Sequence, residues 1–128
     1  MVQVDISQLT TECNNWRETL RSYREEFTHD ENKLRQIAGK PLSKEQLQDV
    51  EHLHNQFHIQ LINIHDLKQA IKNHDRKMDF EKAAFNGSVN EDCLSRHESL
   101  MSEYATLEQT LQGLRTEFND FLVRVQYK

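Results

Sequence analysis

The chain has 128 residues, enough for one domain with a substantial hydrophobic core but too few for two independent domains. Hydrophobic residues make up 36% and charged residues 29%, with only three glycines and one proline, a composition typical of long helices rather than of sheets or disordered chain. The net charge is −5 and the basic residues are scattered, so nothing indicates a surface for nucleic acid. We therefore expect a single domain over residues 1–128.

Targeting signals and disulfides are not indicated. No stretch approaches the roughly 20 apolar residues of a membrane-spanning helix, and the first ten residues have neither a basic start nor an apolar signal segment. The expected location is the cytoplasm, with no membrane partner. Cys13 and Cys93 are too few for a disulfide framework, and each falls on an apolar helical position. We interpret both as buried thiols.

The first predicted helix spans about residues 5–38. Its apolar residues follow alternating steps of three and four, the heptad pattern of a helix packed in a bundle, and Asp30 is the one break. Asp5 begins a sequence with the spacing of a capping box, and Gly39 followed by Pro41 indicates the end of the helix. The residues of the pattern are Ile6, Leu9, Cys13, Trp16, Leu20, Tyr23, Phe27, Leu34 and Ile37.

The second predicted helix spans about residues 43–85. Ser43 and Gln46 have capping-box spacing, in which each side chain bonds the backbone N–H of the other residue. Apolar residues then recur at strict seven-residue spacing, so one face of this helix is expected in the core. They are Val50, Phe57, Ile64, Ile71, Met78 and Phe85.

The third predicted helix spans about residues 90–126. Gly87 is suited to end the preceding helix, and Ser88 or Asn90 to cap this one. The three-four alternation continues through residues that include two polar side chains, those of Cys93 and His97. The full set is Cys93, His97, Leu100, Tyr104, Leu107, Leu111, Leu114, Phe118, Phe121 and Val125.

Three long helices with short connections must place neighbours antiparallel, and apolar seams that repeat every seven residues favour left-handed coiled-coil packing. The sequence therefore predicts an all-α fold, an up-down-up antiparallel three-helix bundle with heptad packing. In its length and in the tryptophan of its first helix, Trp16, the chain resembles a single spectrin-type repeat in topology. The resemblance implies a fold and no function.

Polar residues interrupt the apolar seams at a few positions. Matching the helix ends places Asp30 level with His54, and places His74 level with His97 in a layer near Leu9. Buried polar groups need partners, so each pair is expected to bond across helices and to fix the alignment of the bundle.

The histidines of the second helix allow a different interpretation, as metal ligands. His54 and His58 are four residues apart and project from one face, and Glu51 offers a carboxylate nearby. His65 lies on that face but about 10 Å further along the axis, too far to share one ion easily. Matching acidic ligands do not recur on the other helices, as they do in di-iron bundles. We therefore expect no bound metal and no organic cofactor.

Catalytic motifs are not found in the sequence. It contains no Gly-rich phosphate loop, no Cys-x-x-Cys and no nucleophile elbow, and long helices with short loops offer few places for a concave pocket. The sequence predicts a protein that is not an enzyme and that has no evident small-molecule substrate.

The centre of the second helix carries apolar residues on more than its core face. Ile59 and Ile62 lie roughly opposite the core stripe, and Phe80 lies on the same outer side. Scattered exposed aliphatics are ordinary on monomers. The alternative is a two-fold dimer that pairs two copies of this helix, with His58 and His65 at the rim, where charging of imidazoles near pH 6 would weaken association.

Together these observations predict a non-enzymatic helical module for interaction or scaffolding, self-associating as a homodimer through its second helix. The alternative is a metal-binding helical bundle that uses the histidines of the second helix.

Overall fold

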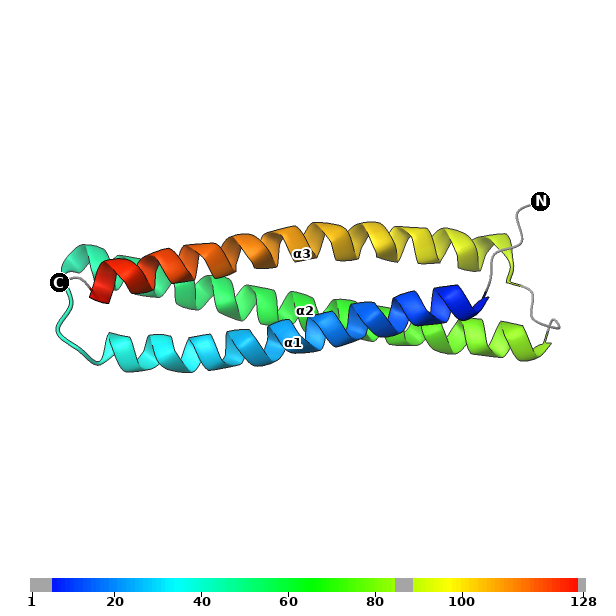
Figure 1. Ribbon diagram of the computed structural model, residues 1–128, viewed down its shortest axis with the longest axis horizontal. Coiled ribbons are helices and arrows are strands. Elements are labelled where there is room, and N and C mark those ends of the chain that lie inside the picture. The colour runs from blue at the N-terminus through cyan, green and yellow to red at the C-terminus, as the bar shows by residue number, and fades with distance from the viewer. Residues whose placement is uncertain (1–5, 85–88, 127–128) are drawn as a thin grey trace.

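The computed structural model describes residues 6–84 and 89–126, which form three long helices and no strand. They are α1 (Ile6–Ala38), α2 (Lys44–Ala84) and α3 (Glu91–Gln126). Figure 1 shows them side by side as an elongated bundle, with α1 and α3 running in one direction and α2 in the other. α2 packs against both of the other helices. The predicted all-α, up-down-up arrangement is confirmed, and the helix bounds differ from the predicted ranges by one residue at most.

Capping side chains determine where α2 and α3 begin. The backbone N–H of Ser43 donates to Gln46 Oε1 at 2.9 Å, and the backbone N–H of Gln46 donates to Ser43 Oγ at 3.2 Å, a complete capping box. At the start of α3, Asn90 Oδ1 accepts from the backbone N–H of Cys93 at 2.8 Å. The predicted roles of Asp5, Phe85, Gly87 and Ser88 lie outside the described residues.

The end of α1 is closed by backbone hydrogen bonds. Gly39 N–H donates to the carbonyl oxygen of Gln36 at 3.3 Å, and Lys40 N–H donates to that of Ile37 at 3.0 Å. These bonds satisfy carbonyls that have no partner inside the helix. Pro41, which cannot donate, follows directly, so the chain leaves the helix where the sequence predicted.

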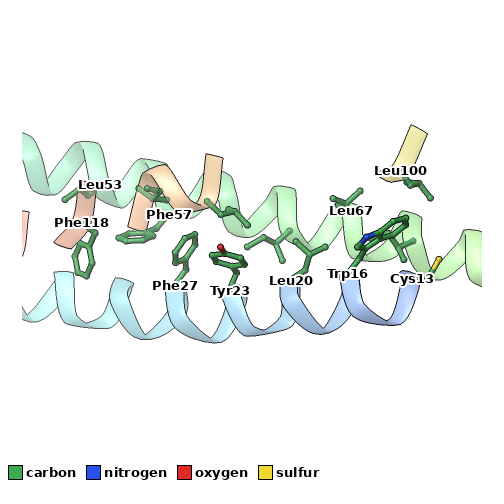
Figure 2. Packing of buried hydrophobic residues seen from close by; sticks show 14 of the residues in the cluster. Cys13, Trp16, Leu20, Tyr23, Phe27, Leu53, Phe57, Leu67, Leu100 and Phe118 are labelled. Atoms are coloured by element: carbon green, nitrogen blue, oxygen red, sulfur yellow. The ribbon is translucent and has the colours of Figure 1, made fainter. Parts of the chain in front are cut away.

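The core is a continuous column of side chains between the helices, drawn in part in Figure 2. Its middle is aromatic: the ring centroid of Phe57 lies 5.2 Å from that of Phe27 and 5.1 Å from that of Phe118, both in edge-to-face contact. One ring from each helix therefore meets in this layer. Further toward the start of α1, the ring of Trp16 stacks on Tyr104 of α3 with 5.8 Å between centroids.

Partly exposed ion pairs tie α1 to its neighbours. Arg115 of α3 binds both carboxylate oxygens of Glu26, each at 2.7 Å, and its guanidinium lies 4.7 Å from the centroid of the Tyr23 ring. Arg17 Nη2 of α1 lies 3.4 Å from Asp75 Oδ2 of α2. Within residues 6–84 and 89–126, no helix is long and apolar enough to cross a membrane.

Candidate functional site

A cluster of buried polar side chains lies in the half of the bundle where α1 begins. It takes one side chain from each helix: Cys13 of α1, His74 of α2 and His97 of α3, exposed by 0%, 4% and 1%. Each occupies a core-facing position of its own seam. Figure 2 shows Cys13 on α1, next to Trp16 along the row of core residues. Three polar groups thus replace an apolar layer.

The donor atoms of the three side chains converge. His74 Nε2 lies 3.1 Å from His97 Nδ1, and Cys13 Sγ lies 3.9 Å from the same nitrogen. All three ligand atoms lie within 4.8 Å of one another. Sulfur and imidazole nitrogen are the atoms that zinc and related transition metals prefer as ligands. Among the described residues, this is the group of three whose spacing suits a metal ion.

Glu12 of α1 orients the His97 ring from outside the cluster. Its Oε2 lies 3.0 Å from His97 Nε2, and the carboxylate accepts the hydrogen bond. Because the proton then resides on Nε2, the lone pair of Nδ1 points toward Cys13 and His74. The Trp16 ring packs against the imidazole with 4.9 Å between centroids and limits its rotation.

In the absence of a ligand the cluster is an incompletely satisfied hydrogen-bond network. His74 Nε2–H donates to His97 Nδ1, since Nδ1 carries the lone pair. The other nitrogen of His74, Nδ1, is buried and has no hydrogen-bond partner among the described residues. A buried polar atom without a partner costs about 1 to 3 kcal/mol, so the arrangement is not explained by stability alone.

Burial keeps two members of the cluster, His74 and Cys13, uncharged. The pKa of His74 falls from 6.5 to about 4, chiefly because burial disfavours the cation, and also because His97, Arg96 and Lys77 lie nearby. The pKa of the Cys13 thiol rises to about 12, mainly through burial and then through the carboxylate of Asp75. At neutral pH His74 is therefore a neutral imidazole and Cys13 a protonated thiol.

A second buried polar group lies nearer the α2–α3 connection. Asn90 Nδ2 donates to Glu81 Oε1 at 2.8 Å, and Glu81 is only 5% exposed. Glu81 Oε2 has no hydrogen-bond partner among the described residues. The adjacent Cys93 thiol has its pKa raised to about 11 by burial and by Glu81. This group links the two helices and leaves Cys93 protonated.

The structure brings one predicted seam pair together and separates the other. His74 and His97 are in hydrogen-bond contact. Asp30 is half-buried and His54 is exposed, and no hydrogen bond or ion pair joins them in the part of the chain that the structure describes. The pKa of Asp30 is raised by burial and by Glu26, and the charged groups acting on it lie on α1 and α3, with none on α2.

The surface of α2 holds the other predicted site residues. His54, His58, His65 and Glu51 are all exposed. His65 Nδ1 lies 3.4 Å from Oδ1 of the adjacent residue, Asp66. Among the described residues, these four side chains do not form a group with metal-ligand spacing. The group that has this spacing lies in the core.

The apolar residues predicted to lie outside the core of α2 are exposed. Ile59 is exposed by 45%, Ile62 by 48% and Phe80 by 71%. Leu47, near the start of α2, is also exposed by 45%. α1 and α3 therefore leave an apolar part of the α2 surface uncovered.

The sequence did not predict that Cys13 belongs to the buried cluster or that Glu12 contacts it. It placed His74 and His97 level with Leu9, whereas Glu12 and Cys13, about one turn further along α1, reach them. The available signal was the adjacent pair of an acidic residue and a seam cysteine. Such a pair does not indicate which residues of the other helices it will contact until the alignment of the helices is known.

The chain matches no family model, no curated protein and no solved structure.

Proposed function

We propose that the protein is a non-enzymatic helical interaction module that self-associates through the outer surface of α2. In this proposal the bundle packs by heptads like a coiled coil, has the topology of a spectrin-type repeat and works in the cytoplasm. The observation that carries the proposal is the exposure of Ile59 and Ile62 at the centre of a helix that already contacts both of its neighbours. Association with a further surface would cover them.

The exposed apolar side chains of α2 lie within one arc of the helix. At about 100° per residue, Ile62 and Phe80 project in the same direction, and Ile59 and Leu47 project about 60° to either side. These four residues, Leu47, Ile59, Ile62 and Phe80, are called the α2 outer surface below. An arc of about 120° matches the width of a helix face that packs against a single partner helix.

The order of these residues along α2 favours a second copy of the chain as the partner. Leu47 and Phe80 lie near opposite ends of α2, and the isoleucines lie near its middle. In an antiparallel pair that sets Leu47 opposite Phe80 of the partner copy, the two Ile62 side chains come within about one turn of each other. A two-fold axis through the centre of α2 thus covers all four residues on both copies.

Charge supports the same alignment. The pairing that sets Leu47 opposite Phe80 also sets Glu51 opposite Arg76, four residues inward from each end. Both side chains are exposed, and neither takes part in an ion pair within the described residues. Each dimer would therefore gain two complementary contacts beside its apolar centre, which fix alignment more than they add affinity.

The test is the mass of the protein in solution. We expect the wild type to sediment as a dimer at about 100 µM and Ile62→Glu to sediment as a monomer, because the substitution buries a charge in the dimer alone. Val123→Glu is the matched control: Val123 is 52% exposed on α3, outside the α2 outer surface, and its variant should remain a dimer. Unchanged circular dichroism shows that each variant is folded.

Two outcomes contradict the proposal. One is a wild-type protein that is monomeric at about 100 µM, a concentration that detects even weak pairing. The other is an Ile62→Glu variant that sediments with the wild-type mass, which would move the interface away from α2.

A further inference from the structure

The buried cluster supplies a donor set that no purely structural layer of a helical bundle requires. One sulfur and two imidazole nitrogens come from three different helices, and their atoms lie within 4.8 Å of one another. Apolar residues of similar size would fill this layer without leaving a buried nitrogen unpaired. The arrangement has the composition of a ligand set.

The distances fit a tetrahedral ion. An ion bound at about 2.0 to 2.1 Å from nitrogen and about 2.3 Å from sulfur holds two nitrogens about 3.3 Å apart, and a nitrogen and a sulfur about 3.5 Å apart. The cluster has His74 Nε2 at 3.1 Å and Cys13 Sγ at 3.9 Å from His97 Nδ1. Shifts of a few tenths of an ångström would bring these two pairs to the required separations, and the third pair, His74 with Cys13, lies within 4.8 Å.

A carboxylate lies beside one of the two histidines, as it does beside histidine ligands in known zinc sites. A metal-bound histidine usually donates its other N–H to a carboxylate, which fixes the tautomer and the ring orientation. Glu12 provides that carboxylate, at 3.0 Å from His97 Nε2. The side chain of Glu12 is 27% exposed, so it also connects the buried site to the surface.

We propose that Cys13, His74 and His97 bind a divalent metal ion of the zinc class, with Glu12 as the residue that positions His97. The ion replaces the hydrogen bond between the two histidines. The proton of His74 then moves from Nε2 to Nδ1 of the same ring, and the Cys13 thiol loses its proton to solvent. Binding therefore releases one proton, and the three protein ligands leave the fourth tetrahedral position to water or another small ligand.

The site links all three helices, so metal binding and folding are coupled. The three side chains are at most 4% exposed, so an ion can reach them only when the bundle opens locally. Loading is therefore tested in two ways, by long incubation of the folded protein and by refolding in the presence of the ion. The protein is used without an affinity tag and with its thiols reduced.

Cobalt(II) is the probe, because it adopts zinc geometries and is coloured. We expect one equivalent to bind, with a thiolate-to-cobalt charge-transfer band in the near ultraviolet and the intense visible bands of four-coordinate cobalt. Zn²⁺ should displace it with the same stoichiometry. X-ray absorption of the cobalt-loaded wild type should show one sulfur and two imidazoles, a readout that depends on no variant.

Matched variants assign the ligands. Cys13→Ser should abolish the charge-transfer band, whereas Cys93→Ser, which alters the other buried thiol, should retain it. Joint replacement of His54 and His58 by alanine should leave binding unchanged, because both are exposed and outside the cluster. Glu12→Gln should weaken cobalt binding by about 10- to 100-fold while the band remains, as expected of a positioning residue.

Three results would overturn the proposal. They are the lack of stoichiometric cobalt after refolding with the ion, a charge-transfer band that survives in Cys13→Ser, and binding that is lost with His54 and His58. The first result would leave the cluster as a hydrogen-bond network that aligns the helices. The third would assign the metal to the α2 surface. None of them affects the dimer test, which probes separate residues.

Discussion

A histidine in the core of a helical bundle is stable there as the neutral imidazole, since an unpaired cation is costly to bury. His74 is in this situation: it is 4% exposed, and its charged neighbours Arg96 and Lys77 add to the effect of burial. The residue therefore links the stability of the metal-free protein to pH.

Stability of the metal-free protein should fall as the pH falls from 6.5 toward 4. The pKa of His74 is 6.5 when unfolded and about 4 when folded, so in this window the unfolded state binds the proton that the folded state excludes. The stabilisation is complete above pH 6.5, and at most about 3 kcal/mol is lost on reaching pH 4. Denaturant unfolding in the presence of a chelator, followed by circular dichroism, measures the free energy at each pH.

The contribution of His74 to the pH dependence of stability is measured by comparing the wild type with variants. The raised pKa values of Asp30 and Asp75 act in the opposite direction, because those carboxyl groups bind protons more readily when folded. His74→Gln removes the imidazole and should flatten the pH dependence, even though it lowers stability throughout. His65→Gln changes an exposed histidine and should leave the slope as in the wild type. Equal slopes in wild type and His74→Gln would contradict the assignment.

At the scale of the helices, the starts of α2 and α3 are capped in different ways. The capping box of Ser43 and Gln46 is exposed and local, since it involves only the first turn of α2. Asn90 caps α3 and also donates to Glu81 of α2. Its single side chain therefore stabilises one helix and attaches it to the next, so the two caps should differ in their importance for folding.

Removing the α3 cap should destabilise the protein more than removing the α2 cap. Ser43→Ala loses one capping bond, at a cost of about 1 kcal/mol. Asn90→Ala loses a cap and also leaves the buried Glu81 carboxyl without its donor, at a combined cost of about 2 to 4 kcal/mol. Denaturant unfolding of both variants gives the comparison.

A third variant separates the two roles of Asn90. Asn90→Ser retains a capping hydroxyl but is too short to keep the bond to Glu81, so its stability should lie between that of the wild type and that of Asn90→Ala. Equal losses for Ser43→Ala and Asn90→Ala would show that the contact with Glu81 contributes nothing.

At the scale of the whole molecule, α2 is the central helix, since it packs against α1 on one side and α3 on the other. The four exposed apolar residues of the α2 outer surface lie where neither neighbour covers α2. The proposed antiparallel dimer assigns these residues a partner and sets one particular alignment of the two copies, with Glu51 opposite Arg76. Alignment can be tested separately from association.

Charge reversal should test that alignment. Glu51→Arg and Arg76→Glu each set like charges opposite one another twice in the dimer, and each should weaken association by about fivefold at low salt. The double variant restores opposite charges and should return to wild-type affinity. Sedimentation equilibrium measures the dissociation constants, and added salt should reduce all the differences. Additive weakening in the double variant would reject this alignment of the two copies.

The sequence by itself determined the three helices, the caps that begin α2 and α3, and most of the core. The heptad spacing of residues such as Leu20, Phe57 and Phe118 predicts which face of each helix is buried. Ser43, Gln46 and Asn90 indicate where two of the helices begin. These features are local, because each depends on residues within a few turns of the same helix.

Only the tertiary structure decided which polar side chains meet. Matching helix ends aligns neighbours to about one turn, or 5.4 Å, whereas a hydrogen bond or a metal bond requires placement within a few tenths of an ångström. An error of one turn decides whether Leu9 or Cys13 lies beside the two histidines, and hence whether this part of the core predicts an apolar contact or a contact with a thiol. Alignment along the axis is set by the packing of all the layers together, so no single stretch of sequence contains it.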